Sequence, residues 1–134
     1  FSVSLNATIQ DSEVVDSADA SIIGNEAQRQ PGFQLRVTPS YEFEMESFYS
    51  TLYGTLSIVD DRFADPGNTV VLDGYESLDI GLTVANDSGL NMNLAIQNLT
   101  DEDALIEGDP RNPTAPNGRF ILPRTVTFSV GYSF

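Results

Sequence analysis

The sequence contains neither cysteine nor histidine, and its six basic residues are all arginines. Without cysteine, disulfides and thiolate metal sites are excluded. Without histidine, the chain lacks the commonest general base, the commonest transition-metal ligand and the usual pH switch. Serine and threonine are plentiful, but no histidine or lysine is present to activate one of them as a nucleophile. We therefore expect that this chain is not an enzyme.

Positive charge and long apolar runs are also scarce. The 20 acidic residues outnumber the basic ones and give a net charge of -14. Such an acidic surface repels the phosphate backbone, which excludes nucleic acids as partners. No apolar run approaches the roughly 18 residues that a transmembrane helix needs. The chain opens at Phe1, in the middle of a strand pattern, so we expect a processed or excised piece of a longer protein.

Six segments alternate apolar and polar residues with period two, which predicts strands with two different faces. We expect them at about residues 1–9, 33–46, 48–59, 75–85, 90–98 and 124–134. They exceed the usual globular strand of about 5–6 residues and match the roughly 9–11 residues of a tilted strand that crosses a bilayer. Pro39 fits this pattern badly, because it removes a ladder donor and predicts a bulge or a local break.

The predicted connections alternate strictly in length. Tight turns fall near Glu46–Ser47 and at Asn86–Gly89, whereas the connections at about residues 10–32, 60–74 and 99–123 are long. Most acidic residues lie in the long connections, and we expect none on the apolar face of any strand. Transmembrane barrels alternate short periplasmic turns with long extracellular loops in this way.

The fold prediction is an all-β chain with one unit over residues 1–134. It is an antiparallel meander of about six long strands, in which tight turns alternate with long acidic loops, and it forms an open segment of an outer-membrane barrel. A soluble antiparallel sandwich with one wet face explains the alternation equally well. It accounts less well for the strand lengths and for the alternating loop lengths.

Several motifs carry a family resemblance. They are Asn98-Leu99-Thr100-Asp101, the run Glu107-Gly108-Asp109-Pro110-Arg111, and a closing strand that ends at Phe134. The chain from Tyr75 onward resembles the C-terminal end of TonB-dependent outer-membrane receptors. Upstream, Gly24-Asn25 and Asp61-Arg62-Phe63-Ala64-Asp65 are similar to the same family, so the resemblance covers nearly the whole chain.

The resemblance implies a parent barrel of 22 strands with a plug in its lumen. It also implies energised uptake of a bulky nutrient such as a siderophore, vitamin or glycan across a Gram-negative outer membrane. The partners that it implies are the rest of the barrel, the plug and the membrane. In this family a final strand that ends in Phe, as here at Phe134, implies a signal read by the barrel-assembly machinery.

One metal site is a candidate. Asp101, Glu102 and Asp103 offer clustered oxygen ligands of the kind that Ca²⁺ takes. Their spacing matches no EF-hand loop, and a solvated acidic loop explains them as well. No other cofactor is expected.

An isolated six-stranded segment would leave two sheet edges and its apolar face uncovered. We hypothesise that such a fragment self-assembles, through these edges and this face, into a β-rich fibre outside the cell or at its surface. The alternatives are a segment within an intact receptor barrel and a soluble secreted β-sandwich adhesin or binding module. The predicted apolar face consists of Val3, Leu5, Leu35, Val37, Leu52, Leu56, Ile58, Leu78, Ile80, Leu82, Leu94, Ile96, Val126, Phe128 and Val130.

Overall fold

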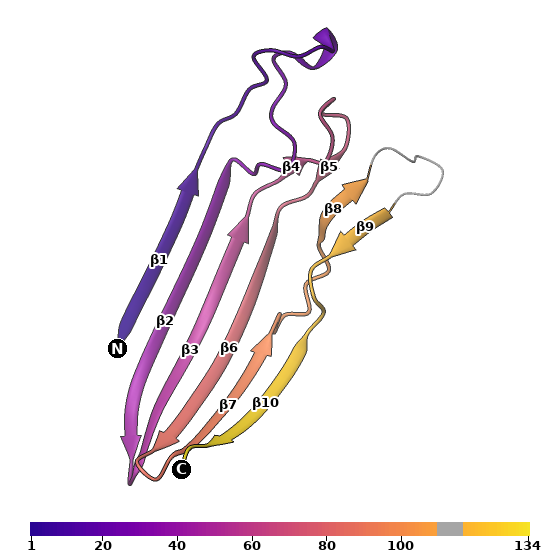
Figure 1. The fold of residues 1–134 in the computed structure, drawn as a ribbon. Helices are drawn as coiled ribbons and strands as arrows, with labels where there is room; N and C mark the ends of the chain where they lie inside the picture. The colour runs from indigo at the N-terminus through magenta and orange to yellow at the C-terminus, as the bar shows by residue number, and fades with distance from the viewer. Residues whose placement is uncertain (110–116) are drawn as a thin grey trace.

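Six long strands lie side by side in one antiparallel sheet of order β1-β2-β3-β6-β7-β10. The computed structural model describes residues 1–109 and 117–134. Figure 1 shows a tall single layer, with the long connections at one end and the tight turns at the other. The strands are β1 (Ser2–Ile9), β2 (Phe33–Met45), β3 (Phe48–Val59), β6 (Tyr75–Asn86), β7 (Leu90–Gln97) and β10 (Thr125–Tyr132).

The prediction of an open antiparallel meander of six strands is confirmed. Each strand pairs with its neighbours in the sheet, and each pair keeps a single register from β1 to β10, with one gap between β2 and β3. The six long strands form a single layer rather than the two facing sheets of the alternative sandwich. Within the described part of the chain, no helix is long and apolar enough to cross a membrane.

The long connections contain short elements that the periodicity did not predict. A turn of 3-10 helix, η1 (Ala20–Ile22), lies in the first connection. The second holds the two-residue strands β4 (Arg62–Phe63) and β5 (Val71–Leu72), and the third holds β8 (Leu105–Asp109) and β9 (Asn117–Phe120). These elements are too short for alternation to mark them. Pro110 and Arg111 of the quoted motif lie outside the described residues.

Pro39 interrupts one ladder without shifting it. Val37 pairs with Leu56, and three residues later Ser40 pairs with Tyr53, so the register on either side of Pro39 is the same. The predicted bulge is therefore wrong, and the predicted local break is a gap in the ladder between β2 and β3. The other edge of β2 stays paired, with Pro39 opposite Val3 of β1.

The most deeply buried apolar residues lie among the long connections rather than on the sheet. Ala64 and Leu72 are each 1% exposed, and Ala104 is 7% exposed. All three belong to the second and third connections. The packed core of the described chain is therefore a small cluster at the loop end, and the sheet itself has no layer packed against it.

Gly81 of β6 makes room for an aromatic ring on the neighbouring strand. It pairs with Tyr53 of β3, and a methyl group at Gly81 would lie 2.3 Å from the Tyr53 ring carbon Cζ. An aromatic side chain that lies over a glycine on the adjacent strand covers exposed backbone and helps to set the register.

Gly81→Ala is expected to destabilise the sheet by about 1–3 kcal/mol, because the added methyl displaces the Tyr53 ring. Gly54→Ala is the matched control, since its nearest contacts at that position are ordinary ones of 3.7 and 4.0 Å. Urea unfolding of each variant in detergent micelles measures the difference. Equal stability of the two variants would contradict the role assigned to the glycine.

Candidate functional site

Most apolar side chains of the six strands share one face, which we call the dry face. Leu94 of β7 pairs with Leu82 of β6 and Phe128 of β10, and Leu82 pairs in turn with Leu52 of β3. Because residues two apart along a strand point the same way, these registers align the apolar positions of every strand. The dry face comprises the fifteen residues predicted from the sequence, Val3, Leu5, Leu35, Val37, Leu52, Leu56, Ile58, Leu78, Ile80, Leu82, Leu94, Ile96, Val126, Phe128 and Val130.

None of these fifteen residues is buried. Leu5 is 64% exposed, Leu52 50% and Phe128 65%. A contiguous apolar surface that spans six strands is far larger than the scattered apolar residues of an ordinary protein surface. The sheet does not fold back on itself, so this face requires a cover from outside the chain.

One acidic residue lies on the dry face, against the prediction. Glu76 pairs with Ile58 and stands two residues before Leu78, so its side chain belongs to the apolar side. It lies at the loop end of β6, where it lines a cavity of about 470 Å³ together with Asp60 and Glu102. On this side of β6 the apolar residues begin only at Leu78. The dry face therefore ends one row of residues before the loop end of the strand.

The opposite side of the sheet, which we call the wet face, carries hydroxyl, amide and charged groups. Thr38 Oγ1 of β2 lies 3.0 Å from Thr55 Oγ1 of β3, across the ladder gap beside Pro39. Asp79 of β6 and Gln97 of β7 belong to the same face. Arg36 is the only basic residue on the six strands of the sheet.

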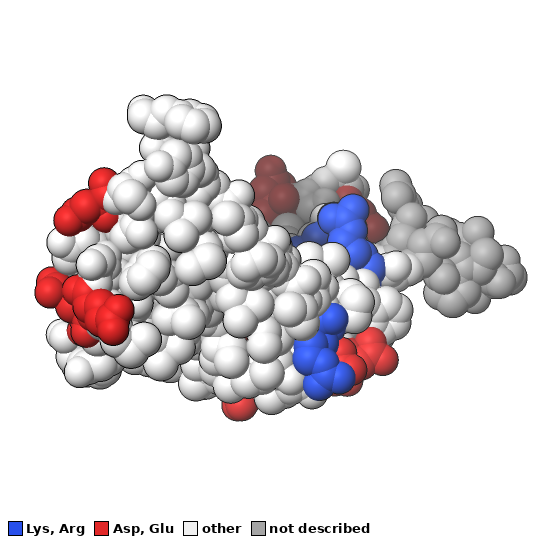
Figure 2. Space-filling model, turned by 90° about the horizontal axis from the view of Figure 1, so that it is seen from below, with Lys and Arg blue, Asp and Glu red and all other residues white. Residues whose placement is uncertain are grey.

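Aromatic side chains gather where the tight turns lie. The rings of Tyr41 and Phe43 are stacked, with centroids 5.9 Å apart. Tyr132 meets Phe134 edge to face at 5.1 Å, and Phe134 itself is fully exposed. Figure 2 shows this end of the molecule, whose surface is mostly uncharged, with charged side chains in a few groups at its margins. Aromatic girdles of this kind mark the interfaces of transmembrane barrels.

The Asn98-Leu99-Thr100-Asp101 motif ends β7 and closes the third long connection. Asn98 is 4% exposed, and its φ of 50° lies in the left-handed region that asparagine tolerates better than most residues. Its amide Oδ1 accepts the N–H of Glu102 at 2.8 Å, and its Nδ2 donates to the carbonyls of Glu102 and Leu122 at 2.8 and 2.9 Å. Its own N–H donates to Asp79 Oδ1 at 2.8 Å.

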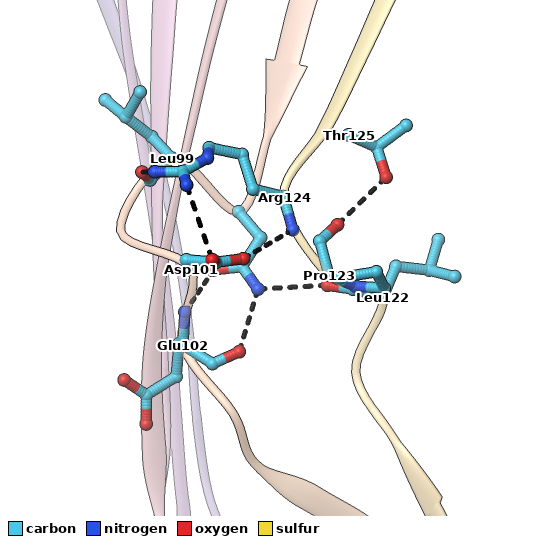
Figure 3. Close-up of polar contacts among 8 residues, drawn as sticks. Leu99, Asp101, Glu102, Leu122, Pro123, Arg124 and Thr125 are labelled. Atoms are coloured by element: carbon cyan, nitrogen blue, oxygen red, sulfur yellow. Dashed lines mark hydrogen bonds and ion pairs between the residues drawn. The ribbon is translucent and has the colours of Figure 1, made fainter.

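Asp101 and Arg124 complete this arrangement, which we call the Asn98 clasp (Figure 3). The N–H of Arg124 donates to Asp101 Oδ1 at 2.9 Å, and the Arg124 guanidinium lies 3.4 Å from Asp101 Oδ2. Arg124 Nη1 also donates to the Leu99 carbonyl at 3.4 Å. The clasp therefore joins the two ends of the third connection and sets the start of β10 beside the end of β7.

This geometry also shows what surrounds the three candidate calcium ligands, Asp101, Glu102 and Asp103. The Asp101 carboxylate is engaged by Arg124, and Glu102 contributes its backbone to the clasp. Asp103 is exposed. Among the residues that the structure describes, no group of three or more acidic side chains is arranged to hold a metal ion.

The first and second long connections are tied to one another. Asn68 Oδ1 accepts the N–H of Glu26 at 2.8 Å, and Asn68 Nδ2 donates to the Glu26 carbonyl at 3.1 Å. The N–H of Arg29 donates to the Phe63 carbonyl at 2.7 Å. Side-chain amides that satisfy backbone groups of another loop hold the two loops in one arrangement.

The third connection joins the same assembly. The guanidinium of Arg62, which is only 8% exposed, donates through Nη2 to the Ile106 carbonyl at 2.8 Å. Arg29 Nη1 lies 3.2 Å from Glu107 Oε1. A methyl group on Gly108 would lie 3.6 Å from the buried Leu72 side chain. The described parts of the three connections thus pack as one unit, the loop cap.

Asp65 organises the turn between β4 and β5 within the loop cap. It is 7% exposed, and it accepts hydrogen bonds from the N–H of Val70 at 2.8 Å and the hydroxyl of Thr69 at 2.9 Å. Burial by itself raises the pKa of this carboxyl, but the hydrogen bonds together outweigh it and the pKa of Asp65 is lowered. The carboxylate is a structural anion that replaces water as the acceptor for the turn.

The sequence motifs include the residues that make these hydrogen bonds, but the sequence did not predict which groups they bond to. Asn98, Asp101, Arg62 and Asp65 all stand in runs that carry the family resemblance. Arg62 has its partner in another connection, Asn98 and Asp101 bond to the far end of the third connection, and Asp65 bonds within its own turn. The positive φ of Asn98 and Asp101 has a weak sequence signal, because asparagine and aspartate favour such positions. Nothing in the sequence pairs Asn98 with Leu122, or Arg62 with Ile106.

The fold and its uncovered dry face define the wall of a β-barrel rather than a self-contained domain. No protein-family model and no curated protein matches the chain. Several solved structures do match the chain. The ferric preacinetobactin receptor BauA from Acinetobacter baumannii is similar over 98% of this chain, with a TM-score of 0.84 and 23% sequence identity.

A second similar structure is the ferric yersiniabactin uptake receptor FyuA from Yersinia pestis, which covers 96% of this chain at a TM-score of 0.84 and 19% identity. The chain spans 20% of the length of each receptor. The predicted resemblance to TonB-dependent receptors is therefore confirmed at the level of the fold, as a six-stranded segment of such a barrel.

Asn98→Ala is expected to lower stability by about 2–4 kcal/mol, because it leaves the part-buried backbone groups of Glu102 and Leu122 without their Asn98 partner and strains a residue at positive φ. Asn93→Ala, on the preceding strand β7 and on its wet face, is the control. Hydrogen exchange in detergent micelles measures the outcome, with faster exchange expected at the start of β10 and in the third connection. Equal exchange in both variants would show that the clasp does not hold these segments.

Proposed function

We propose that the chain forms the C-terminal wall of a ligand-uptake receptor in a Gram-negative outer membrane. The wall has no catalytic role: its dry face contacts lipid and its wet face lines the lumen. The long connections lie outside the cell and the tight turns in the periplasm, as in other outer-membrane barrels. The rest of the barrel and a plug are its partners within the parent receptor.

The observation that supports this proposal most strongly is the uncovered dry face. Burial of each large apolar side chain contributes about 1.5–3 kcal/mol, so a face of fifteen such residues strongly favours a nonpolar surrounding. In a bilayer the backbone groups must also be satisfied by neighbouring strands. The outer edges of β1 and β10 supply the two places where further barrel strands add.

The transported ligand is proposed from the neighbours. Both similar structures are receptors for ferric siderophores, ferric preacinetobactin in one and ferric yersiniabactin in the other. We infer that the parent receptor of this chain takes up a ferric siderophore, with these six strands as part of its channel wall.

Single spin labels test which face meets lipid. The chain has no native cysteine, so Leu94→Cys on the dry face and its neighbour Asn93→Cys on the wet face form a matched pair. In outer-membrane vesicles the label at position 94 is expected to be relaxed by oxygen, and the label at position 93 by a water-soluble nickel complex. The same accessibility at both positions would refute the proposed orientation.

A second function is proposed for the chain when it is separated from a barrel. The exposed dry face and the unpaired edges of β1 and β10 favour self-assembly into a β-rich fibre outside the cell. The two edges differ in sequence, so their contact is heterologous and propagates unless its rotation closes a ring. The dry faces would stack within the fibre, and the acidic loop cap would coat its surface.

Size-exclusion chromatography with negative-stain microscopy of the detergent-free chain tests this assembly. Elongated particles that elute in the void volume are the expected result, since the dry face has no cover on a single chain. Phe128→Asp places a charge on the dry face and is expected to shorten or abolish the particles, whereas Ser129→Asp on the wet face is the control. A monodisperse species at the mass of one chain, 14.6 kDa, contradicts fibre formation.

A further inference from the structure

Arg36 stands apart from the other arginines of the described chain. Arg29 and Arg119 pair with Glu107, and Arg124 pairs with Asp101. Arg62 donates to a backbone carbonyl. Arg36, by contrast, has neither an ion pair nor a side-chain hydrogen bond to any residue that the structure describes, although it is the only cation on the whole wet face.

The surroundings of Arg36 are rich in hydrogen-bonding groups of other strands. Asn6 of β1 and Ser57 of β3 pair directly with Arg36, and Ser77 of β6 pairs with Ser57. One row toward the loops, Gln34 stands on the same face. These side chains line a cavity of about 300 Å³ on the wet face, and no acidic residue contributes to its lining.

The acidic groups of the wet face are occupied or distant. Asp79 lies on β6, and its carboxylate accepts the N–H of Asn98. Glu42 stands six residues from Arg36 along β2, which is about 20 Å in an extended strand. A guanidinium presents paired donors that match a carboxylate or a phosphate group, and hydroxyl and amide groups around it add further donors.

The geometry points to an oxyanion site: Arg36, with Asn6, Gln34, Ser57 and Ser77, binds a carboxylate or phosphate group of a small molecule in the lumen. This inference deepens the proposed function and rests on it, since the cavity meets a transported ligand only if the wet face lines a channel.

In the loop cap, Arg29, Arg119 and Arg124 are held in ion pairs. Arg62 has no ion pair and its Nη1 has no partner among the described residues, but it is buried, whereas Arg36 is exposed to the lumen side. An anionic ligand is therefore held at the wall rather than at the loops.

Nuclear magnetic resonance of the whole chain in detergent micelles tests the site through the arginine Nε–Hε signals. Arg36→Gln identifies the Arg36 signal by its loss. Citrate and inorganic phosphate are titrated separately at constant ionic strength, with acetamide as a neutral probe. The expected result is a saturable shift of the Arg36 signal with one or both anions and none with acetamide. The anion that saturates tells a carboxylate site from a phosphate site.

Calorimetric titration with the same anions separates a built site from general charge attraction. Arg36→Gln is expected to weaken binding at least about tenfold, since charge-assisted hydrogen bonds are lost. Arg36→Lys keeps the charge but not the paired donors, and an intermediate affinity is expected. Arg119→Gln, at an exposed arginine of the loop cap, is expected to leave the affinity unchanged.

Two outcomes overturn the oxyanion site. One is an Arg36 signal that no anion moves; the other is an equal loss of affinity in Arg36→Gln and Arg119→Gln. Either result leaves the spin-label comparison of positions 93 and 94 unaffected, because neither position lines the cavity. A failure of the oxyanion site is thus distinguishable from a failure of the proposed membrane orientation.

Discussion

The structure depends on the alignment of six alternating strands into one sheet with two unlike faces. A shift of any strand by one residue would turn its apolar side chains to the wet face. The observed registers avoid this across five consecutive pairings, even where Pro39 interrupts a ladder. Because the resulting dry face has no cover within the chain, the same alignment that defines the fold also makes it dependent on a membrane, on further strands or on other copies.

The loop end of the molecule holds the packed contacts between distant segments that the single-layered sheet lacks. The Asn98 clasp joins β7 to β10, and Arg62, Asn68 and Glu107 connect segments that are far apart in sequence. These contacts are polar, and most use backbone groups as partners, so they order the connections without a large apolar core. These ties hold the described parts of the three connections in one arrangement above the sheet.

The sequence reading succeeded where a local period carries the information. In β10, Val126, Phe128 and Val130 alternate with small polar residues, and the two tight turns carry residues suited to them. It failed where the period is absent. Glu76 was missed on the dry face because β6 continues above its apolar run, and β4, β5, β8 and β9 were missed because strands of two to five residues leave too few positions to alternate.

The sequence by itself determined the sidedness of the strands, the positions of the tight turns and the absence of the side chains that most nucleophilic catalysis needs. Each of these follows from residues that are neighbours along the chain. Only the tertiary structure decided that Asn98 binds the backbone of Leu122, that Arg62 is buried against the third connection, and that Arg36 stands unpaired among donors from neighbouring strands. Those relations arise from pairing between distant segments, and no local pattern encodes which segment becomes the neighbour.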